Sequence, residues 1–371
     1  MKRLYYLPIL LATIACGTNN SKVECPSTTL ADKQAHLRTI AMFEQLSKSA
    51  QRGYLIGHQD DLAYGHSWNK EAGRSDIKET CGDYPAVFGW ELGDLETGKA
   101  YSLDSVYFAD IQTYMTQVDS MGGLNTISWH SNNIVTGGNC WDVTSKEVVA
   151  SVLPEGANHA KYLTWLDTFA DFISSTTDKD GNAIPVLFRP YHELSGSWFW
   201  WGRDLCTPEQ YKALWRMTFD YLTKTKNLHN LIYCYSMADI ADKDAFMERY
   251  PGDDVVDVIG FDIYQYGTKE QFVDKLKRQS DIVSAIAKEH NKLWAVCEGG
   301  YESIPDSTWF TTAIDSTLKE TDALYVLFWR NAHDKPNHFY APYKGHASET
   351  DFNNFVKQPS TLMLNDFRTT N

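Results

Sequence analysis

Residues 184–193 read IPVLFRPYHE, an apolar run that ends in charged and aromatic side chains. A short continuous apolar run, as opposed to an alternating one, is typical of a strand buried on both faces of a parallel sheet. Seven further segments have a similar form and are bounded by turn-forming residues: 54–60, 85–91, 123–130, 230–236, 255–264, 292–300 and 323–331. The sequence therefore predicts eight strands.

Segments with helical periodicity separate these strands: 31–48, 105–121, 160–174, 208–223, 270–290 and 308–319. Strand–helix alternation over eight strands is typical of an α/β fold of the (β/α)8 TIM-barrel class, here a single domain over residues 31–371. A doubly wound open sheet is the structural alternative. That fold needs no eighth strand and usually has a glycine-rich turn after its first strand, which this sequence lacks.

Polar and aromatic residues collect where the predicted strands end. They are His58, Gln59, Asp60, Trp90, Glu91, Trp129, His130, His192, Glu193, Asp262, Tyr264, Glu298, Trp329 and Arg330. Because all strands of a parallel barrel point the same way, these side chains should meet at one rim. The carboxyl-terminal rim is where barrel enzymes hold their reacting groups, so we expect the functional site there.

The N-terminus has the features of an export signal. Two basic residues precede an apolar segment at 4–14, and Cys16 follows the small residue Ala15. The sequence predicts a signal peptide over 1–15, lipidation of Cys16 and a polar tether over 16–30. We therefore expect an exported protein, a periplasmic or outer-membrane lipoprotein that touches the membrane only through its lipid.

Composition narrows the class of partner. The chain has 34 basic and 48 acidic side chains, a net charge of −14, which argues against binding nucleic acid. It also has 12 Trp, 21 Tyr and 17 Phe, and aromatic faces suit an uncharged ligand with flat apolar surfaces. We expect a neutral polysaccharide or oligosaccharide as the partner, and a monomeric protein.

No metal site or cofactor is predicted. The cysteines after Cys16 form no CxxC pair or tight Cys/His cluster, and their disulfide pairing stays open. Cys234 and Cys297 lie in apolar strands and are expected to be buried as small hydrophobic residues. His58 and Asp60 could bind a metal ion, but the HxH motif and the lysine of barrel metallohydrolases are missing.

Two glutamates are the strongest catalytic candidates. Glu193 ends the fourth predicted strand and Glu298 the seventh. A buried ion pair that fixes the fold, for example with Arg189, is the alternative role for either one. Two such carboxyl groups across one rim suit glycoside hydrolysis, in which one acts as acid and the other as nucleophile or base. A separation of about 5–5.5 Å gives retention and about 6.5–9.5 Å gives inversion.

One motif resembles a known family. Residues 189–193 (RPYHE), followed by Trp198 and by WWG at 200–202, resemble the acid/base signature of glycoside hydrolase family 26. That family consists mostly of β-mannanases and belongs to the clan of retaining barrel hydrolases with glutamates on strands four and seven. Weaker matches in the same strand order are His58, Trp129, His130, 260–264, Glu298 and 329–331.

The resemblance implies roles for individual residues. Glu193 would be the acid/base and Glu298 the nucleophile, with His192 positioning Glu193 and Tyr264 donating to the nucleophile. Trp329 would form the floor under the sugar at the point of cleavage. Other cleft residues would be His130 and Trp198, beside the scissile bond, and Arg330, toward the next sugar on the non-reducing side.

Together with the two glutamates, the resemblance thus implies a retaining endo-1,4-β-mannosidase-type hydrolase acting on mannan, galactomannan or glucomannan by double displacement. The alternatives are the same chemistry on xylan or mixed-linkage glucan, and a non-catalytic glycan-binding lipoprotein.

A long rim loop at 132–158 could close one end of the cleft and favour near-terminal cleavage. Trp90 and Trp294 are expected to pack the barrel, and one of Trp200 and Trp201 to lie in the core.

Overall fold

The structure is a computed structural model, and it describes residues 30–370. The predicted signal peptide and Cys16 lie outside these residues, as does the predicted tether except for Leu30. Among the described helices, none has the length and hydropathy needed to cross a membrane.

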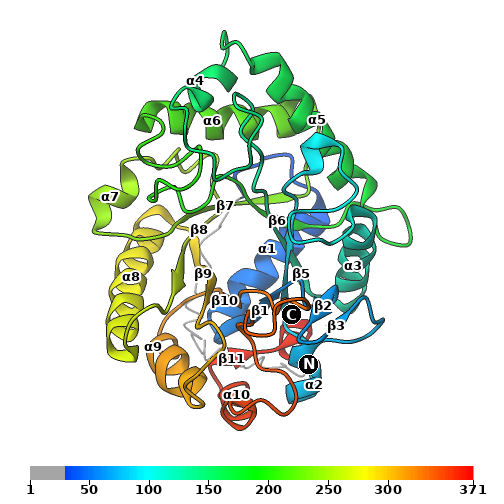
Figure 1. The fold of residues 1–371 in the computed structure, drawn as a ribbon, viewed down its shortest axis with the longest axis vertical. Coiled ribbons are helices and arrows are strands. Elements are labelled where there is room, and N and C mark those ends of the chain that lie inside the picture. The colour runs from blue at the N-terminus through cyan, green and yellow to red at the C-terminus, as the bar shows by residue number, and fades with distance from the viewer. Residues whose placement is uncertain (1–29, 371) are drawn as a thin grey trace, which may run out of the picture.

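The eight predicted strands form a closed barrel (Figure 1). Each pairs in parallel with the next, and the last pairs with the first. They are β1 (Tyr54–Gln59), β4 (Val87–Glu91), β5 (Leu124–Ser128), β6 (Val186–Arg189), β7 (Leu231–Met237), β8 (Val258–Tyr264), β9 (Leu293–Gly300) and β10 (Tyr325–Phe328). The prediction of a (β/α)8 barrel is confirmed, and the open doubly wound sheet is excluded by the β10–β1 pairing.

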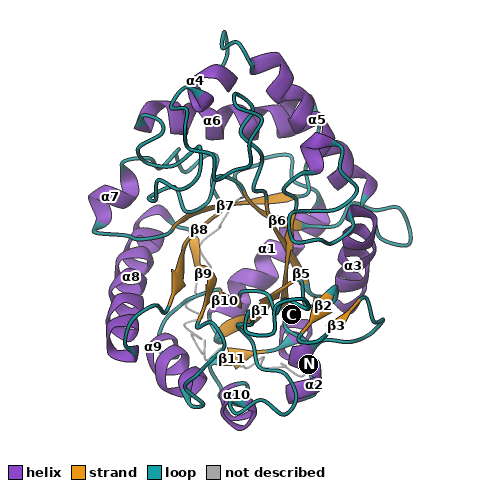
Figure 2. Ribbon diagram, in the orientation of Figure 1, coloured by secondary structure: helices purple, strands orange, loops and turns teal. Residues whose placement is uncertain are grey.

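Helices surround the strands (Figure 2). The long ones match the predicted segments: α1 (Leu37–Ala50), α3 (Phe108–Met121), α5 (His159–Ser175), α6 (Pro208–Asp220) and α8 (Lys269–His290). The predicted helix at 308–319 consists of a π-helical segment, η3 (Phe310–Asp315), and one turn, α9 (Ser316–Leu318). A second π-helical segment, η2 (Tyr221–Thr225), extends α6.

Several short elements were not predicted from the sequence. They are the hairpin β2 (Tyr64–Gly65) and β3 (Trp68–Asn69), the helices α2 (Asp76–Cys81), η1 (Leu95–Thr97), α4 (Val148–Val152), α7 (Lys243–Met247), α10 (Glu349–Phe355) and α11 (Leu364–Arg368), and the strand β11 (Thr361–Leu362), which pairs with the start of β1. Most of them belong to the connections between barrel strands and helices, where five residues or so give too short a pattern to show periodicity.

Both faces of the barrel strands are buried, which explains their unbroken apolar sequences. One cluster lies inside the barrel and is continued by Phe43 and Leu46 of α1, so this helix covers one end of the barrel interior (Figure 1). The other cluster fills the space between strands and outer helices, and it contains Trp90 and Trp294. The prediction that these two tryptophans pack the barrel is confirmed.

Cys234 and Cys297 also behave as predicted. Both are buried in the inner cluster, and their sulfur atoms lie 3.6 Å apart as free thiols. The inner face is therefore apolar toward the amino-terminal end of the strands. Polar side chains begin above the thiols, at the level of Arg189 and Asp262, whose charged groups pair there.

Candidate active site

A cleft of about 580 Å³ opens at the carboxyl-terminal rim of the barrel. It brings together most of the residues that the sequence singled out. The lining includes His130, His192, Glu193, Trp198, Tyr264, Glu298 and Trp329. The two candidate glutamates, which lie 105 positions apart in the sequence on different strands, therefore share one cavity.

A bulge in β9 aims Glu298 into this cleft. Val296 is opposite Phe261 of β8, but Asp262 is opposite Glu298, so β9 carries one extra residue here. The same shift appears against β10 on the other side. Strict alternation would turn Glu298 outward because Cys297 already points inside; the extra residue lets both face the interior.

Cationic and hydroxyl donors hold the Glu298 carboxylate. The Arg189 guanidinium donates to its Oε1 and, at 2.9 Å, to Oδ2 of Asp262. The Tyr264 hydroxyl donates to Oε2 at 3.1 Å. The ion pair considered as an alternative role for the glutamates thus exists, yet the same carboxylate also lines the cleft. Glu298 is therefore paired with a guanidinium and still lies where a ligand can reach it.

Glu193 has different surroundings. The extended strand β6 ends at Arg189, four residues earlier than the predicted segment, and both Tyr191 and Glu193 have positive φ angles, of 50° and 53°. A left-handed conformation is costly for residues other than glycine and is often retained at functional sites. Here it turns the Glu193 side chain into the cleft, where Oε2 accepts a hydrogen bond of 2.7 Å from the Trp198 indole.

The environment of Glu193 favours its protonated form. Burial and the nearby negative charge of Glu298 raise the pKa of Glu193 to about 7, against the opposing effects of the Trp198 hydrogen bond and of Arg189 and His130. A carboxyl group with a pKa near neutrality can donate a proton at pH 7 and take it back later. Glu193 therefore meets the requirement for a general acid/base.

A hydrogen-bonded chain below the cleft was missed in the sequence. Glu91 is fully buried, and its Oε2 accepts from the His130 Nδ1 at 2.7 Å. Its Oε1 accepts from the backbone N–H of His130, and its Oε2 accepts also from the Ser128 hydroxyl. The Nε2 atoms of His130 and His192 lie 3.0 Å apart. The only sign of this chain in the sequence was that Glu91 and His130 end consecutive predicted strands.

The charges along this chain are distinct. Burial opposes a proton on His130, but Glu91 raises the pKa of His130 above its usual value. Burial, together with Arg189 and His130, lowers the pKa of His192 well below the usual range. These opposite shifts favour a proton on His130 and a neutral His192, so His130 is the donor across the 3.0 Å contact. Glu91 thus favours a positive charge beside the cleft.

Arg330 lies outside the set that lines the cleft, next to Trp329. Its Nε is 2.9 Å from Oδ1 of Asp104, and Nη1 donates to the Tyr64 hydroxyl at 3.2 Å. Burial raises the pKa of Asp104 to about 6, although the charge of Arg330 opposes this. Asp60 accepts from Tyr64 in the same cluster. Arg330 is thus held in place by side chains from the loops after β1 and β4.

The aromatic lining differs from the prediction. Neither Trp200 nor Trp201 faces the cleft: both are buried, and their indoles donate to the backbone oxygens of Ser131 and His192 at 2.8 Å. Phe199 lines the cleft in their place. Because two short turns follow β6, adjacent residues do not alternate as they would in an extended segment, so the expectation of one core tryptophan was too low.

The long loop at 132–158 contributes Trp141 to the cleft. The Trp141 ring stacks on His130 with a centroid distance of 5.6 Å, and the indole remains half-exposed. The loop backbone is tied down where Cys140 accepts from the N–H of Trp200. The sequence did not predict where Trp141 lies. The structure shows that it lines the cleft, because it belongs to the long connection between β5 and β6.

Histidine and carboxylate side chains of the kind that bind metal ions gather in one place. His192, Asp262 and Glu298 are the one group of such side chains in the described chain whose ligand atoms lie within 4.8 Å of one another. The Arg189 guanidinium already bonds to both of these carboxylates and would repel a divalent cation. The sequence had also suggested His58 and Asp60 as possible metal ligands. In the structure His58 pairs with Asp61 at 2.7 Å, and Asp60 accepts from the Tyr64 hydroxyl.

Comparisons with known proteins agree with this geometry. The sequence model for glycosyl hydrolase family 26 matches residues 31–349. The structure of a GH26 β-mannanase from Bacteroides ovatus superposes with a TM-score of 0.87 at 44% identity, covering 89% of this chain and 95% of that one. A mannan endo-1,4-beta-mannosidase from Bifidobacterium adolescentis is 31% identical over 96% of this chain, and one from Bacillus subtilis strain 168 is 31% identical over 72%.

The chain spans 37% of the length of the Bifidobacterium relative and 72% of that of the Bacillus relative. The family predicted from residues 189–193 is therefore confirmed. With a family match over most of its length, the chain belongs to glycosyl hydrolase family 26.

Proposed function

We propose that this protein is a retaining β-1,4-mannanase that cleaves internal or near-terminal bonds of mannan, galactomannan or glucomannan. The observation that carries the proposal is the pair of glutamates in one cleft, with Glu298 bonded to Arg189 and Tyr264 and the pKa of Glu193 raised to about 7. A glycosidase that retains configuration needs one ionised and one protonated carboxyl group, and this pair supplies both.

The proposed reaction has two steps. Glu298 attacks the anomeric carbon while Glu193 gives its proton to the leaving oxygen, which forms a covalent glycosyl-enzyme. Glu193, now ionised, takes a proton from water as the water attacks the same carbon. Glu298 leaves as a carboxylate, and Arg189 and Tyr264 again stabilise its charge. The chemistry requires no group beyond the side chains and water.

The other cleft residues are proposed substrate contacts. Trp329 would carry the sugar at the point of cleavage on its ring face, and Trp198 and His130 would line the region of the scissile bond. His192 would position Glu193, and Arg330, held by Asp104, would extend toward the next sugar. The names of the matched relatives support mannan as the substrate.

The test compares four polymers. We expect the protein to release new reducing ends from mannan and glucomannan faster than from xylan or mixed-linkage glucan, and proton NMR of the first product to show the β-anomer. Binding without new reducing ends would favour a glycan-binding protein, and faster release from xylan or mixed-linkage glucan would reassign the substrate.

The long loop bears on the pattern of cleavage. Because it brings Trp141 into the cleft, we propose that it restricts one end of the bound chain. Early products from long mannan should then be few and short. A broad ladder of oligosaccharides at early times would contradict a restricted cleft.

We also propose that the protein is exported, carries lipid on Cys16 and acts as a monomer in the periplasm or at the outer membrane. The basis for export and lipidation is the sequence of residues 1–16. Expression of the full chain in a Gram-negative host should give a membrane-associated protein, and Cys16→Ser should abolish lipid labelling. Labelling that survives this substitution would contradict the proposal, and light scattering would show the mass of any dimer.

A further inference from the structure

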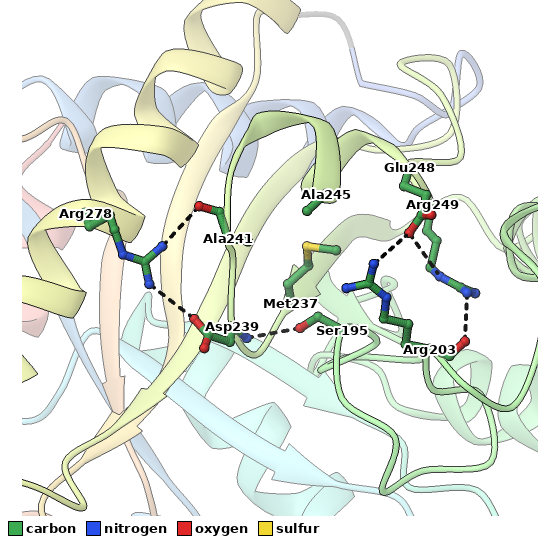
Figure 3. Close-up of a pocket in the computed structure, with 9 residues that line it drawn as sticks. All are labelled: Ser195, Arg203, Met237, Asp239, Ala241, Ala245, Glu248, Arg249 and Arg278. Atoms are coloured by element: carbon green, nitrogen blue, oxygen red, sulfur yellow. Dashed lines mark hydrogen bonds and ion pairs between the residues drawn. The ribbon is translucent and has the colours of Figure 1, made fainter.

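A second hollow lies beside the active-site cleft (Figure 3). Its volume is about 500 Å³, and its walls come from the loops that follow β6 and β7 together with α7 and α8. Asp239 lines both this hollow and the cleft. The Ser195 hydroxyl accepts from the backbone N–H groups of Ala238 and Asp239 at 3.0 Å each, so the wall between the two cavities is cross-linked.

Two pairs of opposite charge face each other across the hollow, as Figure 3 shows. On one side Arg278 lies 3.4 Å from Asp239, and on the other Arg203 lies 3.6 Å from Glu248. All four side chains are between 42% and 62% exposed. Both distances exceed that of a good hydrogen bond. Arg278 also donates through Nη1 to the backbone oxygens of Ile240 and Ala241, so the groups left for a ligand are chiefly those of Arg203, Glu248 and Asp239.

A third arginine is already committed to the protein. Arg249 is buried and donates through Nη2 to the backbone oxygens of Arg203 and Cys206, at 2.8 and 2.9 Å. It therefore holds the loop after β6 against the segment after α7. Besides Arg249, the hollow thus has two arginines, of which Arg278 is engaged by backbone oxygens, and two carboxylates. On the cleft side Lys275 of α8 lies 3.5 Å from Asp239.

The floor between the charged pairs is aliphatic. Met237, at the end of β7, and Ala245 of α7 contribute side chains to it. A neutral sugar has this mixture of surfaces: C–H groups that pack on aliphatic side chains, and hydroxyls that accept from guanidinium groups and donate to carboxylates. The two carboxylates would repel an anion, and the arginines would repel a cation.

The hollow also lies on a definite side of the reacting groups. Ser195 and Arg203 belong to the loop that begins at Glu193, whereas Glu298 and Trp329 lie at the ends of the other strands β9 and β10. Since Glu193 would protonate the leaving oxygen, its loop borders the leaving part of the substrate. We propose that the hollow is a sugar-binding site for a hexosyl residue on the leaving side of the substrate, beyond those in the cleft. The inference rests on the proposed function.

The test uses one variant that removes a donor and one that fills the space. Arg203→Ala removes a half-exposed side chain without disturbing its backbone oxygen, which Arg249 needs. Ala245→Phe fills the hollow and leaves all charges in place. Arg216→Ala is the matched control, because Arg216 is 44% exposed and pairs with Asp254 outside both cavities.

The readout is kcat/KM on mannotetraose and mannoheptaose, with and without galactosyl branches. We expect Arg203→Ala to lower the value for the long or the branched substrate about tenfold, the loss of one charged hydrogen bond. Ala245→Phe should lower the same value at least as much, because its ring occupies the space of the sugar. Both variants should leave linear mannotetraose unchanged. A loss on the long linear chain assigns a backbone sugar to the hollow, and a loss confined to branched chains assigns a branch sugar.

Equal ratios of long to short substrate in wild type and both variants would overturn the inference while mannanase activity stood. Equal losses on every substrate would overturn it too, since they would indicate a change in the cleft. A wild-type protein that cleaves no mannan would overturn the proposed function itself.

Discussion

The ends of β6 and β9 carry the same side chain in opposite environments. At the end of β9, Glu298 accepts hydrogen bonds from the charged Arg189 side chain inside the barrel and from the Tyr264 hydroxyl. At the end of β6 the chain leaves the extended conformation, and Glu193 is bonded to one neutral donor, the Trp198 indole. One carboxyl group is given a cationic partner, and the other is given burial and a negative neighbour.

The difference teaches that the division of roles depends on the backbone as much as on the neighbours. A one-residue bulge brings Glu298 to the arginine, and after two left-handed residues Glu193 bonds to the Trp198 indole instead. Without these two backbone features, the glutamates at the two strand ends would have similar surroundings and similar protonation behaviour. Each prediction below either removes this asymmetry or measures it.

The largest effect should come from removing each carboxylate. Glu298→Ala should lower kcat on mannan by about 10⁴-fold or more, because no nucleophile remains. Glu193→Ala should lower it by about 10²- to 10⁴-fold, the usual contribution of general acid–base catalysis. Initial rates of reducing-end release measure both, with circular dichroism as the control for folding. Near-wild-type rates from either variant would refute the assignment.

A substrate with a good leaving group should separate the two variants. With a dinitrophenyl β-mannobioside no proton is needed for departure, so Glu193→Ala should form the glycosyl-enzyme rapidly and then stall. A burst of dinitrophenol followed by a slow phase is expected, and added azide should speed the slow phase. Glu298→Ala should give no burst. The reverse pattern would exchange the two roles.

Stability should show the same contrast. Arg189→Ala leaves Asp262 and Glu298 buried without their cation, and breaking a buried pair in this way costs about 3–5 kcal/mol of unfolding free energy. Trp198→Phe removes only the indole donor of a half-exposed ring and should cost about 1 kcal/mol or less. Urea unfolding measures both changes, and equal losses would contradict the contrast.

The smallest effect should be a shift in pH dependence. Because Glu193 acts in its protonated form, kcat/KM should fall as the pH rises through about 7. Glu91→Gln should remove the charge that keeps His130 protonated, and His130 lowers the pKa of Glu193. The alkaline limb of the kcat/KM profile should therefore shift to higher pH, by less than about one pH unit.

Ser128→Ala is the control for that shift, because Ser128 donates to Glu91 without carrying charge. It should leave the alkaline limb in place. A limb that moves downward in Glu91→Gln, or stays at the wild-type position, would show that His130 does not act on Glu193 through its charge.

The sequence predicted the barrel well because every strand is buried on both faces and therefore reads as an apolar run. The same feature located the rim, since the runs stop where polar residues such as Glu193 and Glu298 begin. The bulge in β9 left no trace in the sequence, because inserting one residue into an apolar strand changes neither composition nor boundaries.

Residues after β6 were predicted less well. The turns at 194–202 place Phe199 in the cleft and bury Trp200 and Trp201, and such turns follow from tertiary contacts, among them the indole bonds to Ser131 and His192. Glu91 was visible only as a strand end. Its pairing with His130 depends on which side chains of β4 and β5 face the same way, which the register fixes and a single strand does not reveal.

The most direct test of the central claim is to trap the intermediate with an activated 2-deoxy-2-fluoro-β-mannobiosyl fluoride and map the label by mass spectrometry. The fluoride departs without help from an acid, and the fluorine at C2 slows release of the glycosyl-enzyme. The account predicts one added disaccharide, on the peptide that contains Glu298. A label on Glu193 or on any other residue, or an unlabelled protein that turns the reagent over, would contradict it.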